Sequence, residues 1–279
     1  MARTVPSRRT RGSIATTCRD TGPEEIALLP DPLPATPPAT PPATPPATPP
    51  ATPPATRPAT PPDAVLLDLD GTLADSEPLW SRATAELAAR HGAPWDDATD
   101  GHRIVGWAIP DIAALLVARG VALPSPVVEE WLNDRVAALM GAEPPWRPGA
   151  TALLGALVDA GVPTALVTMT YRRLATTVRD AAPPGALAVV VAGDDVRRGK
   201  PDPEAYLTAA ATLGADPARC VAVEDSLTGV TAALAAGALT YAVQPATVLP
   251  AALADHPRVR RVDGLPAVAA ALGLSAAGR

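Results

Sequence analysis

The stretch AVLLDLDGTLADS, residues 64–76, joins a continuous apolar run to two aspartates and a Gly-Thr turn. Continuous apolar character predicts a strand over residues 65–68 that is buried on both faces. In an extended chain Asp68 and Asp70 point the same way, and two carboxylates about 6 Å apart repel by about 3 kcal/mol at an effective dielectric constant of about 20. A hard cation between them removes that cost. A solvated Asp-Gly loop is the alternative for so short a motif.

The chain after residue 64 alternates short apolar runs with amphipathic, Ala-rich stretches. The apolar runs predict strands at residues 65–68, 163–168, 187–192, 220–223, 239–243 and 259–262, and the stretches between them predict helices at 150–160, 171–180, 203–213, 227–236 and 265–272. Such alternation is typical of a parallel sheet with helices on both faces. We therefore expect an α/β, Rossmann-like core made of residues 63–76 and 147–279.

Residues 77–146 interrupt this alternation and carry no strand signal. They predict helices at 77–90, 110–119 and 126–140. They also hold the chain's five tryptophans, of which Trp80, Trp95, Trp107 and Trp131 lie within the range and Trp146 is its last residue. A helical subdomain inserted after the first strand lies over the C-terminal ends of the strands, where open α/β sheets bind ligands. The segment therefore predicts an α-helical cap that acts as a lid.

Residues 1–62 differ in composition from the remainder. From residue 33 to residue 62 a four-residue Pro/Ala/Thr repeat runs almost unbroken. Such a segment buries too little apolar surface to offset its ordering entropy, so we expect a disordered extension with polyproline-II character. A ligand for a proline-recognising domain and a start codon assigned too early are the alternatives. The segment SRRTRG at residues 7–12 lacks the apolar region of an export signal.

Bulk properties of the 279 residues narrow the function further. The net charge of −6 argues against a nucleic-acid partner. No apolar stretch reaches the roughly 20 residues of a membrane helix, so no membrane partner is expected. Two cysteines far apart, Cys18 and Cys220, are no disulfide framework, and a cytoplasmic location is the simple interpretation. The sequence does not indicate the oligomeric state, and a monomer is compatible with it.

A second acidic motif, VAVEDS at residues 221–226, also ends an apolar run. Glu224 and Asp225 close the run, and Ser226 is suited to cap the helix that follows. If both strands belong to one parallel sheet, these acids share an edge with Asp68 and Asp70 and form an oxygen-ligand Mg²⁺ site. The three histidines, residues 91, 102 and 256, lie outside the motifs, which argues against zinc and against a Ser-His-Asp triad.

Two further motifs suit a phosphate. Lys200, in RRGKPDPEAY at residues 197–206, is the chain's only lysine, and a compact ammonium suits a point contact to phosphate; a surface lysine by chance is the alternative. The strand predicted at residues 163–168 ends in Thr168, whose hydroxyl and the free N–H groups after it can bind phosphate oxygens. The N–H groups of Gly71 and Thr72 can hold an anion as well.

Taken in order, these four motifs resemble those of the haloacid dehalogenase superfamily, in the beta-phosphoglucomutase-like and phosphatase branch with a helical cap. The resemblance implies that Asp68 is the nucleophile, forming an aspartyl-phosphate, and that Asp70 is the general acid and base. It also implies a metal site made of Asp68, Asp70 through its backbone carbonyl, Glu224 and Asp225, and a phosphate site made of Gly71, Thr72, Thr168, Met169 and Lys200. The implied cofactor is Mg²⁺.

The predicted cap bears on the choice between a phosphatase and a mutase, which share this core. A mutase holds a second phosphate, yet the cap contains no lysine and offers His102 and Arg103 beside an apolar face at Trp107. Arg103 and Trp107 are therefore the expected specificity residues. We expect a phosphatase acting on a small phosphorylated metabolite such as a sugar phosphate. The alternatives are a beta-phosphoglucomutase-type mutase and a non-catalytic binding protein on the same fold.

Overall fold

The computed structural model describes residues 61–101, 103–104, 107–243 and 249–274. The predicted disorder of residues 1–62 falls outside these ranges apart from its last two residues, and so does His102. Among the described residues, no helix is long and apolar enough to cross a membrane.

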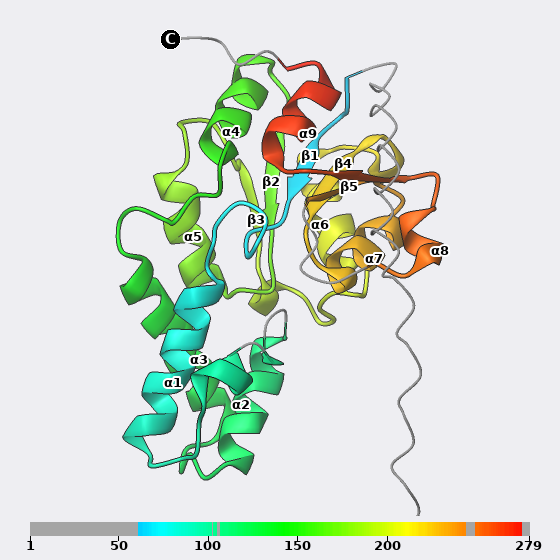
Figure 1. Ribbon diagram of the computed structural model, residues 1–279. Helices are drawn as coiled ribbons and strands as arrows, with labels where there is room; N and C mark the ends of the chain where they lie inside the picture. Colours follow the sequence, from blue (N-terminus) through cyan, green and yellow to red (C-terminus); the bar gives the residue numbers. More distant parts are fainter. Residues whose placement is uncertain (1–60, 102, 105–106, 244–248, 275–279) are drawn as a thin grey trace, which may run out of the picture. The chain divides into compact units, whose positions relative to one another are not determined.

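A six-stranded parallel sheet forms the core, in the order β3-β2-β1-β4-β5-β6 (Figure 1). Its strands are β1 Val65–Leu67, β2 Thr164–Val167, β3 Val189–Val191, β4 Val221–Glu224, β5 Leu239–Val243 and β6 Val259–Val262. The first motif lies on a central strand, since Leu66 pairs with Ala165 of β2 and with Ala222 of β4. All three residues of β1 are fully buried, which confirms the predicted α/β fold with a parallel sheet.

Helices cover both faces of the sheet. They are α4 Ala150–Asp159, α5 Arg172–Ala181, α6 Glu204–Leu213, α7 Leu227–Ala235, the short α8 Ala251–Ala254, and α9 Leu265–Leu272. Because neighbouring strand residues face opposite ways, Leu67 packs in one apolar cluster with α4, α5 and α9, and Leu66 in another with α6 and α7. The two layers hold β1 rigidly, and its C-terminal end with it.

Two sequence predictions about strands need correction. The strand predicted from residue 187 begins at Val189, because Leu187 has a left-handed backbone (φ 53°) that a strand does not admit. The first strand ends at Leu67, so Asp68 and Asp70 lie in the loop beyond it. The tight turn after the strand, and not the alternation of an extended chain, therefore determines where Asp70 lies.

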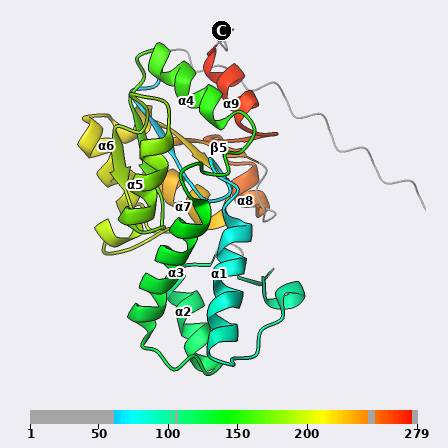
Figure 2. The same ribbon diagram turned by 90° about the vertical axis from the view of Figure 1, so that its left-hand side faces the viewer.

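A helical insertion, residues 77–146, follows the first motif. It contains α1 Glu77–Arg90, a π-helical turn Asp97–Gly101, α2 Ile109–Ala118 and α3 Ser125–Met140. The views in Figures 1 and 2 agree that these helices lie beyond the end of the sheet.

The two chain connections of the helical insertion run side by side. Ala74 and Trp146 form an antiparallel bridge. The N–H of Asp75 donates to the carbonyl of Pro145 at 2.8 Å, next to that bridge. The insertion is therefore joined to the core through a short two-stranded hinge.

Candidate active site

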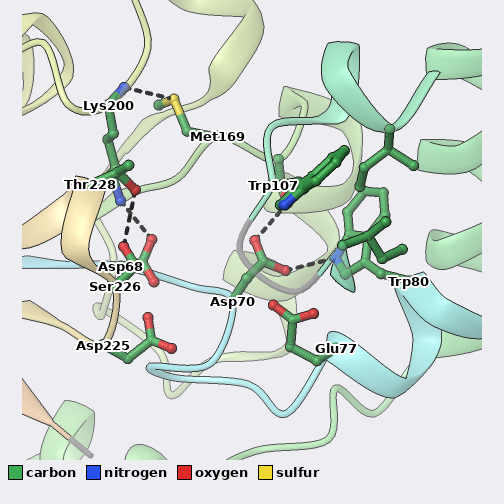
Figure 3. Close-up of a pocket in the computed structure, with 13 residues that line it drawn as sticks. Asp68, Asp70, Glu77, Trp80, Trp107, Met169, Lys200, Asp225, Ser226 and Thr228 are labelled. Carbon is green, nitrogen blue, oxygen red and sulfur yellow. Dashed lines mark hydrogen bonds and ion pairs between the residues drawn. The ribbon is translucent and has the colours of Figure 1, made fainter. Parts of the chain in front are cut away.

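A pocket of about 120 Å³ lies where the C-terminal edge of the sheet meets the helical insertion (Figure 3). Its lining differs between the two sides. The charged residues are Asp68, Asp70, Glu77, Lys200 and Asp225. The large apolar residues from the insertion are Trp80, Ile104, Trp107 and Ile112. The two acidic motifs and the loop that carries Lys200 therefore converge on one cavity.

Lys200 and Asp68 form a buried ion pair at this edge. Asp68 comes directly after β1, and its N–H still donates to the carbonyl of Val223 on β4 at 3.1 Å. The Lys200 Nζ donates to Asp68 Oδ1 at 2.6 Å, to Glu224 Oε1 at 2.6 Å and to the Val167 carbonyl at 3.0 Å. An ammonium has three protons, so all three are used to fix the Asp68 carboxylate against the ends of β2 and β4.

Glu224, the last residue of β4, is fully buried and anchors this pair from beneath. Its Oε1 accepts from Lys200 and from the Tyr206 hydroxyl, both at 2.6 Å. Its Oε2 accepts from the Ser226 hydroxyl at 3.1 Å and from the Ser226 N–H at 3.4 Å. Both oxygens are therefore engaged by the protein, as a buried charge requires.

Asp225 is held by the Gly-Thr turn of the first motif. The Thr72 hydroxyl donates to Asp225 Oδ1 at 3.3 Å. A Cβ at Gly71 would lie 2.0 Å from Asp225 Oδ2, and Gly71 has a φ of 79°. Space and backbone conformation both require glycine there. Gly71 and Thr72 thus contact the acid of the second motif, while their predicted contact with phosphate stays a prediction.

Three carboxylates in this region are placed to share a cation. Asp68, Glu224 and Asp225 each offer an oxygen within 4.8 Å of the others. Burial, followed by the charges of its neighbours, raises the pKa of Asp225 to about 9 and that of Asp68 to about 7. Burial alone lowers the pKa of Lys200, but the Asp68 and Glu224 charges outweigh it and hold that pKa above its ordinary value.

One ammonium therefore faces three carboxylates, and the excess negative charge is of a kind that a divalent cation offsets. Carboxylate oxygens are the donors that Mg²⁺ prefers. The cluster of described acids fits such an ion and does not include the Asp70 side chain.

The Asp70 carboxylate accepts four hydrogen bonds. Its Oδ1 accepts from the Ser76 hydroxyl at 2.6 Å and from the Trp80 Nε1 at 3.0 Å. Its Oδ2 accepts from the hydroxyls of Thr170 at 2.7 Å and Thr168 at 3.2 Å. The donors come from the segment before α1, from α1 itself and from the loop after β2. Asp70 is therefore held at the boundary between core and insertion.

The loop after β2 places two predicted phosphate ligands differently from each other. Thr168 is fully buried, and its hydroxyl is directed at Asp70. Met169 lines the pocket, and its Sδ accepts from the Lys200 N–H at 3.3 Å. Glycines make room for it, because a Cβ at Gly193 would lie 2.2 Å from the Met169 carbonyl and one at Gly199 2.7 Å from its Sδ. The predicted roles of Thr168 and Met169 on phosphate stay predictions.

The predicted specificity residues lie together on the insertion. The Arg103 guanidinium is 5.7 Å from the centre of the Trp107 ring, and the Trp107 side chain is 37% exposed and lines the pocket. Of the described residues that line the pocket, Lys200 is the one cation.

Sequence reasoning missed three residues that shape the site. Trp80 and Tyr206 reach Asp70 and Glu224 with side-chain donors, and neither has a local sequence signal. Gly229 had one, because a glycine inside a helical pattern often marks close packing. A Cβ there would lie 1.9 Å from Glu224 Oε1.

Comparison with known proteins agrees with this geometry. The profile of the haloacid dehalogenase-like hydrolases matches residues 62–237. Hexitol phosphatase A of Escherichia coli is 36% identical over 209 residues, 71% of this chain and 87% of that protein. N-acetylmuramic acid 6-phosphate phosphatase of Pseudomonas aeruginosa is 34% identical over 215 residues, 70% of this chain and 91% of that protein.

Solved structures agree as well. CbbY from Rhodobacter sphaeroides in complex with phosphate has a TM-score of 0.65 at 30% identity, over 76% of this chain and 100% of that one. The resemblance inferred from the motifs and the prediction of a phosphatase-type hydrolase are confirmed. The roles of individual site residues and the domain boundaries stay predictions.

Proposed function

We propose, since this chain belongs to the haloacid dehalogenase-like hydrolase family, that it is a Mg²⁺-dependent phosphatase of sugar or polyol monophosphates. The observation that carries the proposal is the pair of carboxylates in one pocket. Asp68 is buried and fixed by Lys200, and Asp70 is fixed separately by hydroxyl and indole donors. Two carboxyl groups held in different surroundings suit a nucleophile and an acid-base group.

In the first half of the proposed reaction an oxygen of Asp68 bonds to phosphorus as the bond from phosphorus to the ester oxygen breaks. The electron pair stays on the ester oxygen, which takes the proton of the Asp70 carboxyl group and leaves as an alcohol. In the second half water attacks the phosphorus of the aspartyl-phosphate and gives a proton to Asp70. The bond from phosphorus to Asp68 breaks, inorganic phosphate leaves, and both carboxyl groups return to their starting states.

Mg²⁺ would be held by Asp68, Asp225 and the backbone carbonyl of Asp70, and it would shield the phosphate charge from the anionic nucleophile. Glu224 has both oxygens engaged within the protein. Its contribution in this proposal is to orient Lys200 and, through water, to complete the shell of the ion.

The lining of the pocket supports a phosphatase over a mutase. A second phosphate group on the substrate would meet the Glu77 carboxylate and an apolar wall that includes Trp107. Two relatives named for phosphatase activity, on a hexitol and on N-acetylmuramic acid 6-phosphate, support the same choice. We infer that the helical insertion acts as the cap that contacts the leaving group.

Phosphate release from a panel of sugar, polyol and nucleoside monophosphates tests the proposal, measured with Mg²⁺ and with EDTA. Asp68→Asn should lower kcat by about 10³-fold or more. Asp63→Asn is the matched control, because Asp63 lies at the start of the same segment and pairs at the surface with Arg219. Release that survives EDTA or the Asp68 substitution would contradict the mechanism. Isomerisation of a sugar 1-phosphate without phosphate release would indicate the mutase.

A further inference from the structure

A tryptophan of the helical insertion contacts the proposed acid-base carboxylate directly. Trp80 belongs to the first turn of α1 and is 7% exposed. Its Nε1 donates to Asp70 Oδ1 at 3.0 Å, the contact drawn between α1 and Asp70 in Figure 3. Its ring also lines the pocket.

The chemistry of this donor sets it apart from the other three on Asp70. Serine and threonine hydroxyls rotate and both donate and accept, whereas an indole N–H only donates. The Trp80 contact therefore requires that one oxygen of the Asp70 carboxylate faces α1, as Oδ1 does here. The hydroxyls of Thr168 and Thr170 then hold Oδ2 on the core side.

The origin of the donors gives this arrangement a second property. Thr168 and Thr170 follow β2 of the core, but Trp80 is carried by the insertion. A displacement of α1 relative to the sheet would break the indole contact and leave the threonine contacts in place. The orientation of Asp70 is thereby linked to the position of the insertion.

We infer that Trp80 is a positioning residue that orients Asp70 toward the leaving group, an inference that rests on the proposed function. Burial and packing alone give Trp80 a structural role, so the test must separate the N–H from the ring. Trp80→Phe keeps an aromatic ring and removes the donor. Trp95→Phe is the matched control, because the Trp95 Nε1 also donates to an aspartate, Asp97 Oδ1 at 2.8 Å. Trp95 and Asp97 do not line the pocket.

The experiment compares kcat/KM for two substrates in the presence of Mg²⁺. One is the alkyl phosphomonoester that the wild type cleaves best, whose leaving group needs a proton. The other is p-nitrophenyl phosphate, whose phenolate leaves without one. The ratio of the two values is taken on one preparation, so it does not depend on the folded fraction, and kcat/KM covers the step in which the leaving group departs.

General acid catalysis contributes about 10²–10⁴-fold, so we expect Asp70→Asn to lower the alkyl-to-aryl ratio by about 10²-fold. Trp80→Phe should lower it by about tenfold and Trp95→Phe should leave it unchanged. An unchanged ratio in Trp80→Phe beside a lowered one in Asp70→Asn overturns the inference alone, as does an equal fall in Trp95→Phe. An unchanged ratio in Asp70→Asn overturns the acid role itself and the inference with it. Absence of phosphate release by the wild type overturns the proposed function.

Discussion

The two walls of the pocket are built on different principles. On the core wall, charged groups are buried and each is matched to a partner, as in the contacts of Lys200 with Asp68 and Glu224. On the insertion wall the surface is aromatic and aliphatic apart from Glu77 at the start of α1, and Trp107 remains 37% exposed. Fixed charges suit electrostatic stabilisation of a reacting group, which needs no rearrangement during the reaction. An apolar wall suits recognition of the remainder of the substrate.

The comparison predicts that changes on the core wall lower the rate and that changes on the insertion wall alter binding. Lys200→Arg should have the largest effect. A guanidinium cannot place three donors at one point between Asp68, Glu224 and the Val167 carbonyl, so we expect kcat to fall by about 10²–10³-fold. Arg198→Lys, an exchange at an exposed site in the same loop, should leave kcat within about twofold. Equal effects of the two exchanges on kcat would contradict the prediction.

Gly229→Ala tests whether the core wall depends on Glu224, the buried carboxylate that accepts from Lys200. Its Cβ would overlap the buried Glu224 carboxylate, so we expect the free energy of unfolding to fall by about 1–3 kcal/mol and kcat to fall with it. In Gly155→Ala the new Cβ meets nothing within 4 Å, so helix propensity should raise the free energy of unfolding by about 0.5–1 kcal/mol. Urea unfolding measures the free energy of unfolding of both variants, and a change of the same sign in the two would contradict the argument.

The proposed binding of Mg²⁺ to the carboxylate cluster should depend on pH. The pKa values of Asp68, about 7, and Asp225, about 9, exceed the ordinary value of 3.8, so the metal-free folded protein binds more protons than the unfolded chain. Its free energy of unfolding therefore falls as pH rises from about 4 to about 9. An ion bound to these carboxylates would displace those protons. The Kd for Mg²⁺ should therefore fall as pH rises, by up to about tenfold per pH unit for each proton released.

Isothermal titration with Mg²⁺ at pH 6, 7 and 8 measures this dependence. The Asp225→Asn variant is the control. It removes the group with the higher of the two raised pKa values, so it should make the Kd for Mg²⁺ depend less on pH. A Kd that is constant across this range in the wild type would contradict the assignment of the ion to this cluster.

Trp107→Ala should have the smallest effect and should act on binding. Loss of one aromatic contact of about 0.5–1.5 kcal/mol predicts an increase in KM of about two- to tenfold, with kcat nearly unchanged. Val127→Ala removes another exposed apolar side chain of the insertion, from α3 and away from the pocket, and should change neither constant. Steady-state kinetics with the best substrate distinguishes the two variants. A fall in kcat without a change in KM would contradict the prediction that Trp107 acts on substrate binding.

The core wall was largely predictable from the sequence, because each element carries its own signal. Buried apolar runs that end in acids mark β1 and β4, and parallel strands bring such ends to one edge. The single lysine indicated a role for Lys200. The sequence did not show that its three protons all go to protein acceptors, since the register of β1, β2 and β4 brings those acceptors together.

The contacts between the walls were less predictable. The sequence placed Trp80 in the helix predicted at 77–90 and gave it no role, and only the position of α1 shows that its N–H reaches Asp70. Leu187 was placed in a strand because it is apolar, but side-chain type does not specify a left-handed φ. Gly229 was readable in principle, since a helix interior disfavours glycine unless something lies close to it.

The hinge between core and insertion has a consequence for how new specificities arise. The bridge between Ala74 and Trp146 is closed by hydrogen bonds from Asp75 to Pro145 and from Arg147 to Leu73. The chain therefore leaves the core and returns to it at almost the same point. A turn would suffice to close the core without the insertion, and any module whose ends meet would fit in its place. The insertion is thus replaceable without moving the sheet edge or Asp68, Glu224 and Asp225, and only the Trp80 contact to Asp70 would have to be rebuilt.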